Sequence, residues 1–233
     1  GSPGLALDGP VTELTIRHSD TSPIEGPESD RVATHLALLS ERLGLASSYS
    51  VTISKAIPAH AGLGSGTQLA LALSAALRRL ESLPPDPASD ALLLRRGARS
   101  GIGAALFSHG GFVVDGGHRT GKTLPPIVSR LPFPEDWRII LVVDTEVTGV
   151  HGDAERDAFA KLPLFPELDA AKICHAVLMQ ALPALVERDL TAFGAAISHI
   201  QKCLGDYFAP AQGGARYTSA RVAAEMDAVE RNG

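Results

Sequence analysis

Residues 57–80 (IPAHAGLGSGTQLALALSAALRRL) constrain what this chain can fold into more than any other stretch. An alternating strand-like segment, residues 49–57, leads through Pro58 into a Gly-Leu-Gly-Ser-Gly loop, and a long apolar helix is expected to follow. Glycine has no Cβ atom, so the loop backbone can turn tightly and approach a ligand closely. The start of the helix adds free N–H groups and the positive end of its dipole. The pattern therefore predicts an anion site, most often a phosphate site.

The alternative is an ordinary loop that caps the helix at Ser65. Three glycines within five positions, with hydroxyls at Ser65 and Thr67, favour the anion site. The loop is not a Walker A loop, because no Gly-Lys-Ser/Thr closes it, and its G-x-G-x-G spacing differs from the dinucleotide-binding fingerprint. The residues predicted to bind substrate or phosphate here are Gly62, Leu63, Gly64, Ser65, Gly66 and Thr67.

The pattern Pro-x-x-x-Gly-Leu-Gly-Ser resembles the phosphate loop of the GHMP superfamily of small-molecule kinases. Its continuation, Gly-Ser-Gly-Thr-Gln-Leu-Ala-Leu, resembles one branch in particular, the β-ribofuranosylaminobenzene 5'-phosphate synthases. The resemblance implies a two-lobed α+β fold with the ligand between the lobes. We expect a ribosomal-protein-like α+β lobe over residues 1–125 and a smaller, helix-rich α+β lobe over residues 126–233. The family has further motifs upstream and downstream, so the second lobe is expected to be incomplete.

A second glycine-rich segment distinguishes kinase from synthase. The kinases carry a Ser-Gly-x-Asp segment followed by Gly-Gly, and its aspartate helps to deprotonate the acceptor hydroxyl or to organise the charge around it. Here residues 100–103 read Ser-Gly-Ile-Gly, and Gly110 and Gly111 follow at a matching distance. Gly103 occupies the acid position and can neither accept a proton nor bind a metal through a side chain. The phosphate loop is kept while the acid is lost, which indicates an anion site with another use.

Residues 99–103 (Arg-Ser-Gly-Ile-Gly), Phe112 and residues 114–117 (Val-Asp-Gly-Gly) also resemble the synthase branch. That family joins 4-aminobenzoate to phosphoribosyl pyrophosphate and releases pyrophosphate and carbon dioxide, in methanopterin biosynthesis. The resemblance implies Mg²⁺ bound with the pyrophosphate substrate, and a homodimer; the chemistry needs no pyridoxal phosphate. Two alternatives stay open: a GHMP-type ATP-dependent kinase whose base is Asp115 or Asp144, and a non-catalytic phosphometabolite-binding protein.

Three residues are predicted to be catalytic. Arg99 lies among glycines that leave its guanidinium room to pair phosphate oxygens. Asp115 follows an apolar strand and could orient substrate or metal, although a turn aspartate before two glycines is an equal alternative. Asp144 ends a run that is similar to the phosphoribosyl-pyrophosphate loop of ordinary phosphoribosyltransferases. The spacing there is one residue short and coincidence is the simpler account, so Asp144 is a secondary candidate for holding Mg²⁺ or ribose hydroxyls.

Other residues near the second glycine segment are weaker candidates. Arg96 is predicted to bind substrate, with a role at the carboxyl end of a helix dipole as the alternative. Ser100 and Gly101 are predicted to bind substrate as well. His60 could touch substrate or be a solvated loop residue. The remaining histidines show no ligand-like spacing, so no metal site made by the protein is predicted.

Hydrophobic periodicity predicts the elements around these motifs. The carboxyl-terminal part reads as helical, with Pro183 expected to end or kink its second helix. Strands are expected at residues 11–16, 49–57, 112–114 and, buried, 138–144; helices at residues 29–43 capped by Ser29 or Asp30, 65–80, 89–95, 153–162, 170–182, 190–204 and 216–231.

Composition excludes several classes of function. With 233 residues, 45% of them apolar and 20% charged, the chain can bury a sizeable core. A formal net charge of −5 argues against nucleic acid or an anionic membrane as the main partner. The two cysteines have no C-x-x-C spacing, and no signal peptide or long charge-free run is visible. We therefore expect a cytoplasmic enzyme that acts on small molecules.

Overall fold

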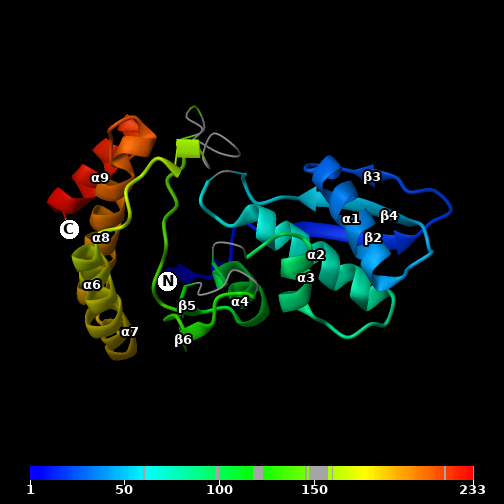
Figure 1. Cartoon of the computed structure of the whole chain (residues 1–233), viewed down its shortest axis with the longest axis horizontal. Helices are drawn as coiled ribbons and strands as arrows, with labels where there is room; N and C mark the ends of the chain where they lie inside the picture. The colour runs from blue at the N-terminus through cyan, green and yellow to red at the C-terminus, as the bar shows by residue number, and fades with distance from the viewer. Residues whose placement is uncertain are drawn as a thin grey trace. The chain divides into compact units, whose positions relative to one another are not determined.

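The computed structural model describes residues 1–59, 61–97, 100–117, 123–144, 146, 157–158, 160–217 and 219–232. These residues form two compact units, Gly1–Pro132 and Phe133–Gly233, which are described separately (Figure 1). The first is α+β and the second is helical in its described part, so the α+β prediction is confirmed. The units divide after Pro132, whereas the sequence placed the boundary between residues 125 and 126.

Two three-stranded sheets form the framework of the first unit (Figure 1). In one, β4 lies in the middle, antiparallel to β2 and parallel to the short β3. In the other, β5 lies between β1 and β6 and is antiparallel to both. The strands predicted near residues 11–16, 49–57 and 112–114 are all present. The strands are β1 Pro3–Leu5, β2 Glu13–His18, β3 Ile24–Glu25, β4 Tyr49–Lys55, β5 Phe112–Asp115 and β6 Ile127–Leu131.

Helix α1, Ser29–Leu43, shows how spacing and capping set an element. Its buried residues recur at helical intervals, and Gly44 ends it in the left-handed conformation (φ 66°), with its N–H bonded back to Glu41 and Ser40. The predicted cap was wrong. The cap is Glu28, at φ 63°, and its side chain makes no capping hydrogen bond.

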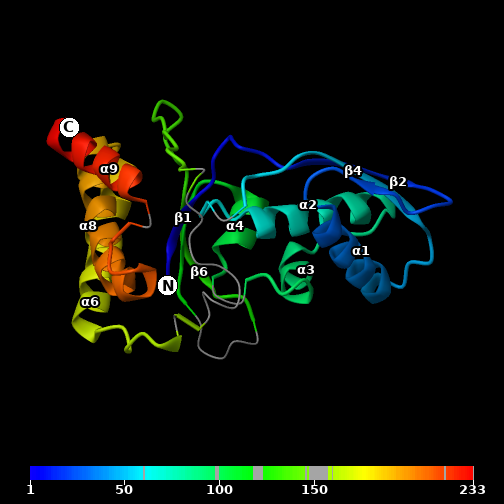
Figure 2. The ribbon, with the colours of Figure 1, turned by 90° about the horizontal axis from the view of Figure 1, so that it is seen from above.

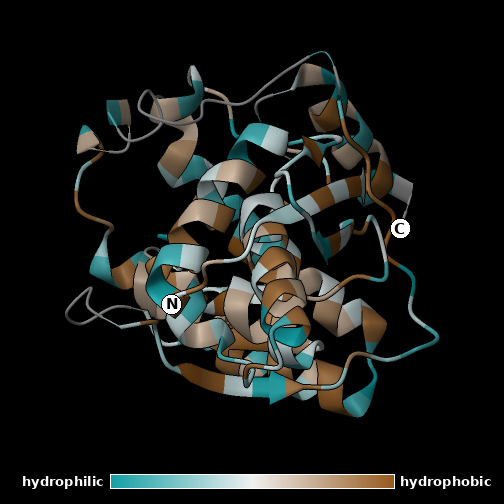
Figure 3. Cartoon of the chain, turned by 90° about the vertical axis from the view of Figure 1, so that its right-hand side faces the viewer, coloured by the Kyte–Doolittle hydropathy of each residue, from teal (hydrophilic) through white to brown (hydrophobic). Residues whose placement is uncertain are grey.

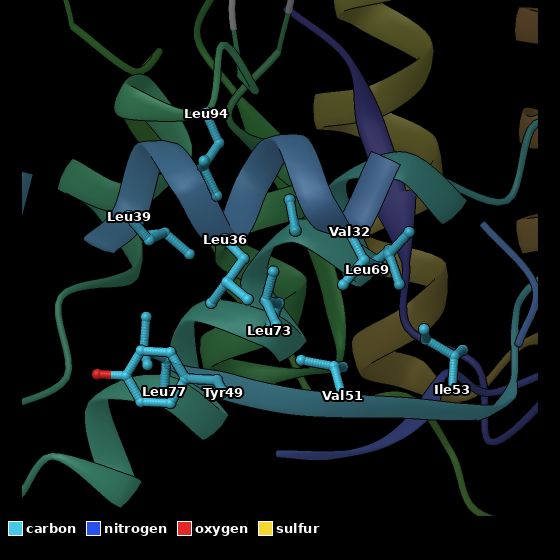
Figure 4. Close-up of a cluster of buried hydrophobic side chains, with 11 residues drawn as sticks. Val32, Leu36, Leu39, Tyr49, Val51, Ile53, Leu69, Leu73, Leu77 and Leu94 are labelled. Atoms are coloured by element: carbon cyan, nitrogen blue, oxygen red, sulfur yellow. The ribbon is translucent and has the colours of Figure 1, made fainter. Parts of the chain in front are cut away.

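Helices α1 and α2 (Ser65–Leu80) cover one face of the β2–β4–β3 sheet and enclose the core (Figure 2). Figure 4 shows Tyr49, Val51 and Ile53 projecting from β4 toward leucines of both helices. Alternate residues of a strand share a face, which is why these three enter the same core. The buried core residues are Val32, Leu36, Leu39, Tyr49, Val51, Ile53, Leu69, Ala70, Leu73, Leu77 and Leu94.

Helix α2 is buried on a second side, where it meets α3, Pro87–Leu93, and α4, Ile102–His109. Brown and teal bands alternate along the helices in Figure 3, as expected for helices with one face in a core. A buried ion pair also ties α2 to α3. Arg78 donates from Nε and Nη2 to the two carboxylate oxygens of Asp90, at 2.6 and 2.7 Å, and Ser74 donates to the same carboxylate. These contacts fix the carboxyl-terminal half of α2 against α3.

The described part of the second unit is built from consecutive helical segments. Pro183 was expected to end or kink a helix, but the chain continues through it. The π-helical segment η1 comes directly before α7, so the hydrogen-bond pattern changes at Leu182, and the N–H that Pro183 lacks falls at this change. The segments are α6 Glu167–His175, η1 Ala176–Ala181, α7 Leu182–Glu187, α8 Leu190–Phe208, η2 Ala209–Gln212 and α9 Ala220–Asn232.

By length and composition alone, the run Glu167–Glu187 could cross a membrane. One such run is weak evidence, because core helices of soluble proteins meet the same criterion. In this unit η1 packs on α8 and buries Ala176, Val177 and Ala181.

The buried strand predicted over residues 138–144 is not formed. These residues have no regular secondary structure, and Ile140 is 86% exposed. Isoleucine and valine favour strands only when a neighbouring strand completes the hydrogen-bond ladder, and no described strand pairs with this run. The helix predicted over residues 153–162 lies largely outside the described residues.

Candidate functional site

The glycine loop leads directly into the first turn of α2, and no side chain caps the N–H groups of that turn. Gly62 and Gly64 have φ values of 73° and 68°, which glycine adopts without strain. Gly64 is the cap residue, and its carbonyl accepts from the N–H groups of Thr67 and Gln68 at 3.0 and 3.1 Å. Within the described residues, nothing accepts a hydrogen bond from the N–H of Ser65 or Gly66. This helix start thus offers free donors to an anion.

Arg96 brings a positive charge to the same turn. A Cβ atom at Gly66 would lie 3.0 Å from Arg96 Nη1, so glycine leaves the room that the guanidinium occupies. Among the described residues, the buried Nε of Arg96 has no hydrogen-bond partner, and no carboxylate forms an ion pair with this side chain. Burial, and then the charge of Arg31, lower the pKa of Arg96 below its ordinary value. Such a guanidinium is suited to pair phosphate oxygens.

His35 of α1 supports Arg96 from behind. Its Nε2 lies 3.4 Å from Arg96 Nη2, and its Nδ1 is buried without a partner. Burial lowers the pKa of His35 to about 4, with the charges of Arg96 and Arg31 adding to the effect. The ring is therefore neutral at pH 7, and Nε2 can accept a hydrogen bond from the guanidinium.

We predict that the folded chain loses stability as the pH falls from about 6.5 to 4. His35 titrates near 6.5 when unfolded and near 4 when folded, so the unfolded state binds more protons in this window. The contribution is complete above pH 6.5 and amounts to about 1–3 kcal/mol. Denaturant unfolding at pH 7 and pH 4 measures it. His35→Gln should flatten the profile and the exposed His109→Gln should not; parallel profiles for wild type and His35→Gln would refute it.

Asp115 organises the second glycine segment from a fully buried position. Its Oδ1 accepts from the N–H groups of Ser2 and Gly117 at 3.0 and 3.1 Å. Its Oδ2 accepts from Ser100 Oγ at 2.5 Å and from the Gly101 N–H at 3.0 Å. The carboxylate thus positions Ser100 and Gly101, two residues predicted to bind substrate, where α4 begins.

Asp115→Asn should lower both stability and activity. The amide replaces one acceptor oxygen with an NH₂ group that would face two donors, so buried polar groups lose their partners. We expect a loss of about 1–3 kcal/mol in unfolding free energy. Denaturant unfolding and the rate of product formation measure the two effects. The exposed Asp20→Asn carries the same chemical change and should be silent; equal stability of the two variants would contradict this role.

Gly103, where the kinases have an acid, packs against the start of α2. A Cβ atom at this position would lie 2.8 Å from Thr67 Cγ2, closer than real Cβ contacts. The Gly103 carbonyl accepts from Gln68 Nε2 at 3.0 Å. The two glycine motifs therefore meet, and an aspartate at position 103 would have to displace Thr67.

Some predicted residues cannot be placed beside this loop. Arg99 and His60 lie outside the described residues. Asp144 belongs to the second unit, where it accepts from Ser219 Oγ at 2.6 Å and from the Glu146 N–H at 3.0 Å. Across the described part of the chain, no three metal-binding side chains cluster.

Sequence reasoning missed two residues of the site, His35 and Gln68. His35 lies on the buried stripe of α1, between Val32 and Leu36, so helical periodicity could have flagged it. Gln68 lies in the resembling motif itself, but only the fold shows that its amide reaches α4.

Known proteins share both the sequence pattern and the fold. Residues 31–111 match the family model "GHMP kinases N terminal domain". A β-ribofuranosylphenol 5'-phosphate synthase of Archaeoglobus fulgidus is 37% identical over 214 residues, 87% of this chain and 68% of the relative. The enzyme of that name from Methanothermobacter thermautotrophicus is 31% identical over 223 residues, 86% of this chain and 68% of the relative.

Among solved structures, a homoserine kinase from Cytophaga hutchinsonii is similar, with a TM-score of 0.57 and 20% identity over 84% of this chain. At that identity the likeness concerns the fold alone. The chain spans 65% of the length of that kinase.

Proposed function

Because the chain belongs to the β-ribofuranosylphenol 5'-phosphate synthase family, we propose that it joins a para-substituted benzoate to phosphoribosyl pyrophosphate. Pyrophosphate and carbon dioxide would be released. The donor enters as its magnesium complex. We further propose that the chain acts as a homodimer in the cytoplasm and that its product is used in methanopterin biosynthesis.

The main support for this proposal is an anion site at the start of α2 that lacks the catalytic acid of a kinase. The free N–H groups of Ser65 and Gly66 and the guanidinium of Arg96 converge on one turn of α2. Gly103 occupies the position of the kinase aspartate and packs on Thr67, so no carboxylate reaches the anion site from this position. An anion site of this kind can stabilise a leaving pyrophosphate without deprotonating a hydroxyl.

The proposed reaction is balanced without a redox partner. The C1–O bond of the ribose breaks, and its electron pair leaves with pyrophosphate. The ring carbon that bears the carboxylate forms the new bond to C1. The bond to the carboxylate then breaks, its electrons restore the aromatic ring, and carbon dioxide departs. The loop donors and Arg96 act on the charge that develops at the leaving group.

Two acceptors fit this chemistry. The resemblance of the motifs points to 4-aminobenzoate, while the relatives are named for a product that contains phenol, which favours 4-hydroxybenzoate. Both have an electron-donating para group that activates the ring. We propose 4-aminobenzoate, and a competition assay with both acids at equal concentration decides between them.

The experiment supplies carboxyl-labelled 4-aminobenzoate, phosphoribosyl pyrophosphate and Mg²⁺ to the purified chain. Label should leave as carbon dioxide only when both substrates are present. The match of residues 31–111 to a kinase domain keeps an ATP-dependent kinase as the second candidate. Consumption of ATP with a sugar or a mevalonate-like alcohol, and no release of label, would favour that kinase.

A further inference from the structure

A pocket of about 510 Å³ opens in the first unit beside the glycine loop, a size common among sites for small molecules. Four parts of the chain line it. The amino-terminal segment and α4 contribute walls, the loop residues Gly62, Leu63 and Gly64 close one end, and Gln68 and Ala72 line it along α2. A molecule in this pocket would therefore lie next to an anion bound at the glycine loop.

The lining suits a flat, largely apolar ring. All of the described lining residues are uncharged, and Ile57, Ile102, Leu106 and Phe107 supply much of the apolar surface. A sugar phosphate would find no charged partner among these described residues, whereas an aromatic ring gains from contact with Phe107 and the aliphatic side chains. The phosphorylated donor thus belongs on the loop and the aromatic acceptor belongs in the pocket.

Gln68 is placed to recognise one end of that ring. It lies one helical turn beyond Gly64, about 6 Å along the axis, which is close to the length of a para-substituted ring. One N–H of its amide is bonded to the Gly103 carbonyl, which fixes the side chain. The other N–H and Oε1 remain, and they can pair with an amino or a hydroxyl group. Thr12, another residue of the lining, has a buried Oγ1 that has no hydrogen-bond partner among the described residues.

We propose that this pocket binds the aromatic acceptor and that Gln68 reads its para substituent. The carbon that bears the carboxylate points to the loop, where the ribose carbon of the donor would lie. This inference rests on the proposed function, because the substrate class comes from it. Gln68 is a specificity-determining residue in this account.

The test compares 4-aminobenzoate with 4-methylbenzoate, which has the same shape but cannot hydrogen-bond at the para position. We expect wild type to bind the amino compound about 3–10-fold more tightly in calorimetric titrations, the worth of one hydrogen bond. Gln68→Leu should abolish this preference and leave the affinity for magnesium phosphoribosyl pyrophosphate unchanged. The same substitution at the exposed Gln201 of α8 is the matched control and should retain the preference for 4-aminobenzoate. A preference retained by Gln68→Leu would overturn the assignment.

A second variant guards against misfolding of the first. Ala72→Leu fills the pocket two turns from the loop and should weaken both aromatic acids at least tenfold, with donor binding intact. Unaltered binding of both acids would overturn the pocket. The carbon dioxide assay on wild type tests the reaction separately. A Gln68-dependent preference without label release would overturn the reaction and support the pocket.

Discussion

Gly64→Val is expected to abolish binding of magnesium phosphoribosyl pyrophosphate while the chain stays folded. Gly64 is the cap of α2 at φ 68°, and no atom lies within 4 Å of the place where a Cβ would stand. The Cβ of a valine would therefore meet no other described residue there. It would project into the space next to the free N–H groups of Ser65 and Gly66, and it would disfavour the left-handed backbone by about 1–2 kcal/mol. Calorimetric titration with the donor measures the loss.

Gly44→Val is the matched control for this prediction. Gly44 has nearly the same φ, 66°, also has no atom within 4 Å of a Cβ, and ends α1 away from the loop. Both variants should lose a similar amount of unfolding free energy, but only Gly64→Val should lose the donor. Equal donor affinity in both variants would remove the loop from the site.

Arg96→Lys is expected to slow product formation about 10²–10³-fold, although it retains the positive charge. A planar guanidinium can pair two phosphate oxygens at once, and an ammonium group cannot reproduce that geometry. Loss of a charge-assisted contact made chiefly in the transition state costs roughly 2–4 kcal/mol. Steady-state rates together with donor affinity separate this effect from a simple loss of binding.

Two further variants sharpen this prediction. Arg79→Lys makes the same change at an exposed position in the last turn of α2 and should turn over at the wild-type rate. Arg99 is predicted from the sequence to pair phosphate oxygens, so Arg99→Lys is expected to lose rate as well. If Arg96→Lys and Arg96→Ala both turn over normally, the leaving-group contact belongs to Arg99 or to another residue.

Local sequence patterns were sufficient to predict the glycine turn and the helix α2 that follows it. That the loop binds an anion stays a prediction. Three glycines before an apolar helix require a turn at a helix start, and strand alternation placed Tyr49, Val51 and Ile53 on one face. Both features depend on neighbours in the sequence, so the loop, α2 and β4 could be predicted. That Gly103 replaces a catalytic acid follows from the resemblance to the kinases, and it stays a prediction.

Contacts between distant segments could not be predicted in the same way. The four hydrogen bonds to Asp115 come from residues 2, 100, 101 and 117, and no periodicity brings these together. The pocket beside the glycine loop is also lined by several segments that lie far apart in the sequence. The strand expected at residues 138–144 failed for a related reason, since its composition is right for a strand but its pairing depends on another segment.

We propose that the anion site at the start of α2 stabilises a leaving pyrophosphate and does not serve the transfer of a phosphoryl group from ATP. One reaction mixture tests it, containing the purified chain, Mg²⁺, carboxyl-labelled 4-aminobenzoate, phosphoribosyl pyrophosphate, ATP and a mevalonate-like alcohol. We predict that labelled carbon dioxide and pyrophosphate appear in a one-to-one ratio while ATP stays intact. Formation of ADP and a phosphorylated alcohol, with the label still in the aromatic acid, would contradict the claim.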